Sequence, residues 1–484
     1  MSIIKKLNLP VDENILNTCK SIHFIGIGGI GMSGLAEILL TKGYKISGSD
    51  VKDTPITERL QRLGAKFFFN HAAKNLTSKP DLVVVSTAII ETNVEYKQAK
   101  KLGLKIIPRA KMLAILMNHQ SGIAISGTHG KTTTTNMLAH ILASAGLDPT
   151  YIIGGLVNKI GTNAHLGQSE YLIAEADESD GSFLMLKPRM AIVTNIDRDH
   201  VWFYDNDINN LTLAFKQFIN HIPAGGCVVV CLDDENIAAM LPSLTVPVIT
   251  YGFAKLADFR ISQYQQTGLK THFKVHYLDQ ELTVELNAPG KHNVLNAVAT
   301  IAMAIQLNIS TKAIQTALKE FSGTGRRFQL LGQVNHTHKN ILVVDDYGHH
   351  PCEVAATLEA ARSAWPDRRI VLAFQPHRYS RTQQSFDDFI KVLATADKLI
   401  LLDVYAAGEK PIKNINSATM CSEIKQRYQI DAIHLKRDQN INDLIESDLQ
   451  NNDILIMQGA GSISTMAHAL ITQPHESSRK SANE

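Results

Sequence analysis

The residues that are best suited to carry out chemistry lie in one stretch, Ser121 to Asn136, which contains Gly127-Thr-His-Gly-Lys131-Thr132. An apolar run rich in β-branched residues precedes the glycines and a helical pattern follows, which predicts a strand, a turn and a helix N-terminus. Backbone N–H groups and the helix dipole make such a turn a seat for anions. Lys131 would hold a phosphate as a point charge, and the Thr132 hydroxyl would bind Mg²⁺. We therefore expect a nucleoside triphosphate at this turn, although the loop is the shorter form that opens at Gly127.

Acidic and imidazole side chains follow two later strands predicted in the same region. Glu175 ends an apolar run, and His200 follows the next predicted strand. Polar groups at the carboxyl ends of parallel strands collect in one cleft, and carboxylates are good ligands for Mg²⁺. If the two strands are neighbours, Glu175 and His200 face the phosphates together, as a site with two metal ions requires. For Asp177, Glu178 and Asp180 the sequence leaves a ligand role and a solvated turn equally open.

A second glycine-rich turn lies near the N-terminus, between Ser21 and Gly34. A predicted strand runs into Gly26, Gly28 and Gly31, and a helical pattern follows. The next predicted strand ends in an acidic residue, Asp50, about 20 positions further on, where a dinucleotide fold places its ribose carboxylate. The pattern indicates a Rossmann-like domain whose backbone approaches a pyrophosphate. These residues alone favour NAD, with a nucleotide sugar as the alternative.

The last third of the chain contains polar clusters at the ends of predicted strands. Tyr347 and His349 follow one strand, and His377, Arg378 and Arg381 follow the next. Arginine binds carboxylates and phosphates through a planar fork, so the second cluster suits an anionic ligand. Tyr347 and His349 would line the rim of the same pocket.

Two smaller groups precede this region. Asn293 and Asn296 lie one helical turn apart beside His292, where the amides would hydrogen-bond a base edge; helix capping is the alternative for Asn293. Arg326 and Arg327 follow a glycine turn at a predicted domain junction, from which an arginine could reach phosphates.

The chain of 484 residues is too long for one ordinary core, and about 150 residues per domain suggests three domains. Strands and helices alternate, which predicts an α/β protein with parallel sheets. We expect the domains to span residues 1–118, 119–328 and 329–484, with a small antiparallel insert at residues 258–286 in the second.

Composition excludes several classes of function. Lys and Arg number 48 against 46 Asp and Glu, so a net charge of +2 provides no basic field for nucleic acid or an anionic membrane. The five cysteines are scattered and lack metal-ligand spacing, which is typical of reduced thiols in a cytoplasmic protein. The N-terminus lacks the apolar core of a signal peptide, and no run approaches the roughly 20 apolar residues that span a bilayer.

The order of motifs along the whole chain resembles the Mur ligase family. The motifs are GIGGIGMSG, GTHGKTTTT, AEADESD, TNIDRDH, GKHNVLNA, GTGRRF, DDYGHHP, QPHRYSRT and QGAGS. GTHGKT is shared by all members of the family, whereas DDYGHHP together with GIGGIGMSG is specific within the family. The resemblance implies a Rossmann-like domain for a UDP-sugar, a central P-loop ATPase domain and a Rossmann-like C-terminal domain, in a monomer or homodimer.

The activity that this resemblance implies is ligation of L-alanine to the carboxylate of UDP-N-acetylmuramate through an acyl phosphate. ATP is the co-substrate and two Mg²⁺ ions are the cofactors, in the synthesis of peptidoglycan precursors. The alternative within the family is a ligase that adds a ready-made peptide to the same sugar. The alternative from another class is a nicotinamide-dependent dehydrogenase fused to a nucleotide-binding module.

The resemblance also assigns residues by motif. The UDP-sugar would bind Gly26, Gly28, Gly29, Ile30, Gly31, Met32, Ser33 and Asp50. ATP would bind Gly127, Thr128, His129, Gly130, Lys131, Thr132, Thr133, His292, Asn293, Asn296, Arg327, Asp345 and Asp346. Metal ligands would be Thr132, Glu175 and His200. The acceptor amino acid would meet Tyr347, His377, Arg378 and Arg381. Catalytic groups would be Lys131, Glu175, His200 and His349, with the choice of proton acceptor left open between the two histidines. The modified lysine that other branches of the family place near the second metal has no counterpart in this sequence.

Overall fold

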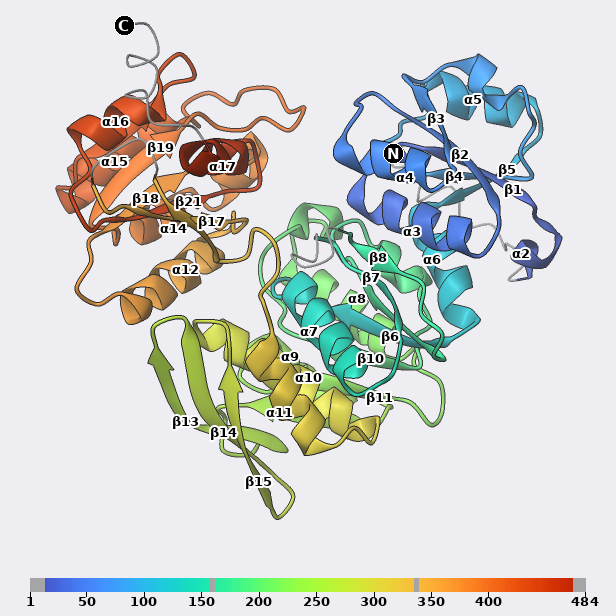
Figure 1. Cartoon of the computed structure of the whole chain (residues 1–484), viewed down its shortest axis with the longest axis horizontal. Helices are drawn as coiled ribbons and strands as arrows, with labels where there is room; N and C mark the ends of the chain where they lie inside the picture. The colour runs from blue at the N-terminus through green and yellow to red at the C-terminus, as the bar shows by residue number, and fades with distance from the viewer. Residues whose placement is uncertain (1–13, 156–161, 335–338, 473–484) are drawn as a thin grey trace, which may run out of the picture. The chain divides into compact units, whose positions relative to one another are not determined.

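Three β-sheets carry the described part of the chain, as the alternation of strands and helices predicts (Figure 1). The structure is a computed structural model and describes residues 14–155, 162–334 and 339–472. The N-terminal residues behind the signal-peptide expectation therefore lie outside the described residues. Contacts divide the chain into two compact units, of which the first holds the N-terminal sheet and most of the central sheet and the second holds the C-terminal sheet.

The N-terminal sheet is wholly parallel, with the strand order β3-β2-β1-β4-β5. Its strands β1 and β4 are almost completely buried, because helices cover both faces of a parallel sheet. β4 is a continuous apolar run, whereas β1 also contains Ser21 and the buried His23. The predicted glycine turn connects β1 to α3. The elements are α2 (Ile15–Thr18), β1 (Ser21–Ile25), α3 (Ile30–Thr41), β2 (Lys45–Asp50), α4 (Pro55–Arg62), β3 (Lys66–Phe69), η1 (Ala73–Leu76), β4 (Leu82–Val85), α5 (Val94–Lys101), β5 (Lys105–Pro108) and α6 (Arg109–Asn118).

The central sheet has ten strands in the order β15-β14-β13-β12-β11-β10-β6-β9-β7-β8. The part around β6, which precedes the predicted phosphate loop, is parallel, and residues Ile123 to Ile125 of β6 are fully buried. The elements up to β12 are β6 (Ser121–Ser126), α7 (Lys131–Ser144), β7 (Thr150–Ile152), β8 (Ala164–His165), β9 (Tyr171–Glu175), η2 (Ser182–Met185), β10 (Met190–Val193), η3 (Val201–Tyr204), α8 (Ile208–Ile219), β11 (Cys227–Cys231), α9 (Glu235–Met240), η4 (Leu241–Ser243) and β12 (Val248–Gly252).

The condition that the strands before Glu175 and His200 are neighbours in the sheet is not met. The strands that carry Glu175 and His200 at their ends, β9 and β10, are not neighbours, because β6 lies between them and pairs with both. Apolar periodicity identifies strands but does not encode their order in a sheet. The connections that follow β9 and β10 therefore begin on either side of the turn that follows β6.

The predicted insert is present as three strands joined by two-residue turns, a connection that only antiparallel strands allow. Two helices follow it and complete the central region. These elements are β13 (Phe259–Thr267), β14 (Lys270–Tyr277), β15 (Gln280–Leu286), α10 (Lys291–Gln306) and α11 (Thr311–Glu320).

The C-terminal sheet has the order β16-β17-β21-β18-β19-β20 and is parallel except for β16. One apolar core packs α12, α14 and α15 against one face, and a second core packs α16 and α17 against the other. The elements are β16 (Gln329–Gln333), β17 (Leu342–Asp346), α12 (Pro351–Ala364), β18 (Ile370–Phe374), α13 (Tyr379–Gln384), α14 (Phe386–Leu393), β19 (Lys398–Leu402), α15 (Ser417–Tyr428), β20 (Ala432–Leu435), α16 (Ile441–Ser447), β21 (Ile454–Gln458) and α17 (Ile463–Thr472).

Two expectations from composition can be compared with the structure. All five cysteines are free thiols. Among the residues that the structure describes, no helix combines the length and the apolar character needed to cross a membrane.

Candidate active site

The phosphate loop forms where the sequence predicts it, between β6 and α7. Gly127 has φ +125° and Gly130, the N-cap of α7, has φ +83°, and both angles favour glycine. Space is also limited: a Cβ on Gly127 would lie 2.1 Å from Thr194 Oγ1, and one on Gly130 would lie 2.5 Å from Asn296 Oδ1. Both glycines are therefore required by the fold. The second contact places Asn296, a predicted adenine-site residue, against the loop.

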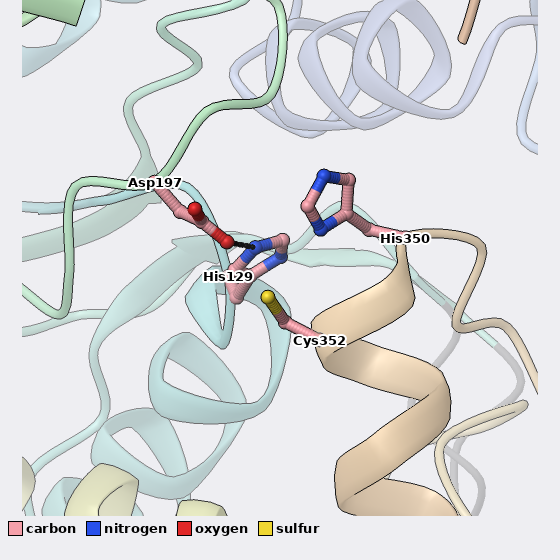
Figure 2. A group of neighbouring side chains, drawn as sticks. All are labelled: His129, Asp197, His350 and Cys352. Carbon is pink, nitrogen blue, oxygen red and sulfur yellow. Dashed lines mark hydrogen bonds and ion pairs between the residues drawn. The ribbon is translucent and has the colours of Figure 1, made fainter. Parts of the chain in front are cut away.

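Side chains from the segment after β10 hold the loop in place. The Thr194 hydroxyl donates to the carbonyl of His129 at 2.6 Å, and the backbone N–H of His129 donates to Asn195 Oδ1 at 2.8 Å. The imidazole Nε2 of His129 lies 3.0 Å from Asp197 Oδ2 (Figure 2). His129 is thus anchored through its backbone and its side chain, which fixes the backbone of the anion seat. Sequence reasoning did not single out Thr194 or Asn195, because their contacts span more than 60 residues.

Two of the predicted metal ligands lie together. The Thr132 hydroxyl at the start of α7 donates to Glu175 Oε2 at the end of β9, with an O–O distance of 3.2 Å. The other oxygen of Glu175 accepts the backbone N–H of Gly154 at 2.5 Å. A hydroxyl and a carboxylate suit a hard cation such as Mg²⁺. Nearby, Glu178 Oε1 is buried and has no hydrogen-bond partner, which also fits a site able to take up a cation.

Lys131 is held by the loop and by an acidic residue of the next strand connection. Its Nζ lies 2.6 Å from the carbonyl of Gly127 and 2.8 Å from Glu178 Oε2. Burial raises the pKa of Glu178 to about 7, although the Lys131 ammonium opposes this shift. Burial tends to lower the pKa of Lys131, but Glu178, Asp177 and Glu175 together raise it above its ordinary value. Lys131 is therefore a charged group surrounded by carboxylates. Glu178, for which the sequence left both a ligand role and a solvated turn open, is buried and contacts Lys131.

His200 lies in the connection after β10, in the left-handed conformation with φ +57°. Its Nε2 is 3.4 Å from Asp199 Oδ2, and its backbone N–H donates to Asp199 Oδ1 at 2.9 Å. Asp199 is largely buried. The carboxylate orients the imidazole, an arrangement common for histidines that bind metals or accept protons.

The glycine turn of the N-terminal sheet also forms as predicted. Gly26 has φ +84°, and the backbone N–H of Gly28 donates to Asp50 Oδ2 at 2.9 Å. Asp50 therefore supports the turn itself, and its contact with a ribose stays a prediction. Met32 and Ser33 are 1% and 2% exposed within α3, and their backbone N–H groups donate to the carbonyl of Gly29, so their contact with a UDP-sugar stays a prediction.

Arg109, which the sequence analysis missed, lies at the first position of α6 and contacts this turn. A Cβ on Gly31 would lie 3.0 Å from Arg109 Nη1 and 3.1 Å from Arg109 Cδ, so the guanidinium stem lies against the glycine. Its charge also helps to lower the pKa of Asp177, an effect that opposes the larger one of burial. Arg109 belongs to no recognised motif, so only its position directly after a buried strand could have pointed to it.

The predicted acceptor residues gather at strand ends of the C-terminal sheet. His349 packs edge-on against Tyr347 and lies 5.7 Å from His377, measured between ring centroids. His377 stacks on Tyr405, a residue after β19 that sequence reasoning did not identify. Arg381 Nη1 is 3.4 Å from His377 Nδ1. A cavity of about 460 Å³ lies beside this cluster and is lined by Tyr405 among others.

Other predicted residues of the C-terminal unit are engaged within it. Arg326 and Arg327 lie over the ring of Tyr347, 4.9 and 4.8 Å from its centroid. Asp346 accepts the backbone N–H groups of Phe328 and Gly348 at 2.7 and 2.8 Å, so it supports the chain at the end of β17.

The neighbouring acid and the last predicted arginine also have partners. Asp345 accepts a hydrogen bond from the Ser464 hydroxyl at 2.6 Å, and burial raises its pKa. Arg378 directs its Nε toward Glu409 at 3.9 Å, which differs from a free acceptor-binding guanidinium.

The start of α10 gives a mixed picture of the predicted adenine site. Asn293 Nδ2 donates to the carbonyl of Pro289 at 2.7 Å, so this amide is used locally at the helix start. Burial lowers the pKa of His292, which favours a neutral ring that could stack on a base. Contact of either residue with a nucleotide stays a prediction.

Three family descriptions match consecutive parts of the chain. Residues 21–121 match "Mur ligase family, catalytic domain", residues 125–304 match "Mur ligase middle domain", and residues 326–461 match "Mur ligase, glutamate ligase domain". Together the matches cover most of the chain.

Two solved structures resemble the chain over nearly its whole length, and a third resembles about two thirds of it. UDP-N-acetylmuramate-alanine ligase MurC from Thermotoga maritima is 28% identical, with a TM-score of 0.79 over 96% of this chain and 100% of that chain. A murein peptide ligase, Mpl, from Psychrobacter arcticus 273-4 is 25% identical, with a TM-score of 0.70 over 94% of this chain and 98% of that chain. The UDP-N-acetylmuramate:L-alanyl-gamma-D-glutamyl-meso-diaminopimelate ligase from Neisseria meningitides is 28% identical, with a TM-score of 0.57 over 63% of this chain and 98% of that chain.

Proposed function

The chain belongs to the Mur ligase family of ATP-dependent ligases in cell-wall synthesis, and from this premise we propose that it joins L-alanine to UDP-N-acetylmuramate. The products would be UDP-N-acetylmuramoyl-L-alanine, ADP and phosphate. The observation that carries the proposal is the arrangement at the phosphate loop. The Thr132 hydroxyl beside Lys131 lies 3.2 Å from Glu175 Oε2 at the end of β9. The full-length likeness to the MurC structure supports alanine as the acceptor.

The chemistry follows from the properties of the substrates. A carboxylate is a poor acyl donor, so its oxygen would first attack the γ-phosphorus of ATP and release ADP. The resulting acyl phosphate would be attacked at its carbonyl carbon by the neutral amine of alanine. The tetrahedral adduct would then expel phosphate and leave an amide, and the surplus proton of the amine would pass to a base.

The residues of this chain have distinct tasks in this scheme. Lys131 would leave Glu178 and hold the phosphate that is transferred, so that charge developing on it meets a fixed cation. Thr132 and Glu175 would hold Mg²⁺, which neutralises phosphate charge when it is bound. The backbone N–H groups after Gly127, which His129 and Asn195 hold in position, would bind the remaining phosphates. Two Mg²⁺ ions and the cytoplasm as the location remain part of the proposal.

Two histidines are the candidates for the proton acceptor, and their surroundings differ. His200 is held by a buried carboxylate, Asp199, at 3.4 Å, which would stabilise the imidazolium that forms. His349 lies in the aromatic cluster with Tyr347 and His377, where an amino acid would bind. We propose that the acceptor amino acid binds beside His349, Tyr347, His377 and Arg381. The metal and the phosphates would bind beside His200.

A second acceptor is considered because one feature favours it. The cavity of about 460 Å³ exceeds what a single alanine fills, and Lys436 and Arg437 line it, so it could hold the carboxylates of a longer peptide. The likeness to the Psychrobacter arcticus murein peptide ligase points the same way.

The test is release of ADP by the purified full-length protein with ATP, Mg²⁺ and UDP-N-acetylmuramate. We expect turnover that depends on L-alanine and exceeds by at least about tenfold the turnover with L-alanyl-γ-D-glutamyl-meso-diaminopimelate. A preference for the tripeptide would assign the second acceptor. ADP release that needs no sugar nucleotide would contradict both assignments.

A further inference from the structure

A fully buried carboxylate organises the polar residues of the N-terminal sheet. Glu95, in the first turn of α5, has no solvent exposure. It accepts hydrogen bonds from the Ser49 hydroxyl and from Asn75 Nδ2, the latter at 2.5 Å. His71 Nδ1 lies 3.2 Å from Glu95 Oε2, and His23 Nε2 lies 3.6 Å from Glu95 Oε1. None of these residues belongs to the glycine turn or to the phosphate loop.

The network fixes which ring nitrogen of His71 carries a hydrogen. An ionised carboxylate only accepts hydrogen bonds, so Ser49 must direct its single hydroxyl hydrogen to Glu95. The Ser49 oxygen then presents only lone pairs to His71 Nδ1, which lies 2.9 Å away. Both neighbours of Nδ1 are therefore acceptors, and Nδ1 must be the donor. In the neutral ring, Nε2 is then left as an acceptor.

Glu95 is ionised in this environment. Burial alone would raise the pKa of Glu95, but the nearby His23 imidazole and the hydrogen bonds from Ser49 and Asn75 outweigh it and lower the pKa below its ordinary value. The titratable side chains that face Glu95 are His23 on β1 and His71 after β3. Glu95 therefore acts as a carboxylate that only accepts hydrogen bonds from its neighbours.

The strand order places His71 at the sheet edge where we expect the base of a nucleotide. The glycine turn follows β1, Asp50 ends β2, and His71 comes two residues after β3, so the three adjacent strand ends carry them in that order. A ligand in a Rossmann-like sheet crosses the carboxyl ends of the strands, so a pyrophosphate at the first end and a ribose at the second direct the base toward the third. The His71 side chain is 16% exposed, and no described residue hydrogen-bonds its Nε2.

We propose that Glu95 is a positioning residue that, with Ser49, holds His71 in the Nδ1–H tautomer, so that Nε2 accepts the N3–H of uracil and rejects cytosine. Uracil presents a donor at N3, whereas cytosine presents a lone pair there, which would face the lone pair of Nε2. The inference rests on the proposed function in one respect, namely that a pyrimidine nucleotide sugar binds the N-terminal domain. It adds a residue that selects the base without touching it.

The first test compares binding of UDP and CDP to the full-length protein by calorimetry. We expect the wild type to prefer UDP by about tenfold or more, corresponding to about 1.4 kcal/mol. His71→Ala and Glu95→Gln should reduce this preference to threefold or less, mainly by weakening UDP. Glu58→Gln, the same substitution at an exposed position of α4, is the matched control and should keep the wild-type preference.

The second test observes the tautomer directly. Nitrogen-15 chemical shifts of the histidine rings, assigned by the loss of one ring in His71→Ala, should show hydrogen on Nδ1 of His71 in the wild type. In Glu95→Gln the Nε2–H form should become populated, a change that a purely structural role of Glu95 would not produce. If Glu95→Gln does not fold, Ser49→Ala removes the other acceptor at Nδ1 and should shift the same signals.

The outcomes separate this inference from the proposed function. If the wild type binds neither UDP nor UDP-N-acetylmuramate, the proposed function fails. If it binds UDP but His71→Ala or Glu95→Gln keeps the preference over CDP, or the wild-type ring carries its hydrogen on Nε2, only the tautomer inference is overturned.

Discussion

Lys131 and Thr132 differ from their partners in how far the sequence can predict them. Both lie in a local motif, so their spacing alone indicates a phosphate loop. Their contacts, Glu178 and Glu175, come 47 and 43 residues later in the chain. Sequence reasoning placed Glu175 near the loop because strand ends collect polar groups, but it could not separate Glu178 from its acidic neighbours, because burial is not visible in the sequence. Arg109 was missed because it belongs to no recognised motif.

At this scale we predict that Glu175→Gln raises the Mg²⁺ concentration needed for half-maximal activity by about tenfold or more, because a neutral amide is a weaker ligand for a hard cation. ADP release measured across a Mg²⁺ titration tests this, with chelation by EDTA as the zero point. Glu170→Gln, at the exposed opposite end of β9, is the control and should leave the titration unchanged. An unchanged Mg²⁺ requirement in Glu175→Gln would remove Glu175 from the metal site.

The elements that position the site follow from short-range patterns. Three strand–turn–helix units, at β1, β6 and the C-terminal sheet, form where apolar runs end in polar or glycine-rich turns. The order of the strands does not follow from these patterns, since it depends on which apolar faces pack together. This is why β6 between β9 and β10 was not foreseen, although this order places the phosphate loop between the two flanking polar clusters.

The turn between β6 and α7 carries a prediction of its own. Gly127→Ala should abolish ATP-dependent turnover, because the new Cβ would meet Thr194 Oγ1 at 2.1 Å and displace the loop. Gly146→Ala is the matched control, because Gly146 also has a positive φ of +83° but open space around its Cβ. It should cost about 1 kcal/mol of stability and keep its activity. Steady-state kinetics with thermal unfolding distinguishes the two, and full activity in Gly127→Ala would show that the loop tolerates a side chain.

For the molecule as a whole, the buried Glu95 network links stability to pH. The pKa of Glu95 is lowered below its ordinary value of 4.5, since the nearby His23 imidazole and the hydrogen bonds from Ser49 and Asn75 together outweigh burial. A carboxyl group with a lowered pKa stabilises the folded state above its unfolded pKa, and this contribution is lost as the pH falls through the folded value. The stability lost in Glu95→Gln is therefore measured on the unfolding of the whole protein.

We predict that Glu95→Gln is less stable than the wild type at pH 7 and that the difference shrinks as the pH is lowered toward 4. Urea unfolding midpoints across this range measure it, with Glu58→Gln as a control that should follow the wild type. A difference that stays constant with pH would show that Glu95 does not titrate with folding.

The contact between Lys131 and Glu178 has a consequence for selectivity among cellular anions. In the resting protein the ammonium is already neutralised at 2.8 Å, and the carboxylate has no solvent exposure. A lone orthophosphate or sulfate would have to separate this pair and leave a negative group stranded in the interior. A magnesium triphosphate brings a bound cation that can compensate that group, so we expect the resting loop to discriminate against simple inorganic competitors before any reaction begins.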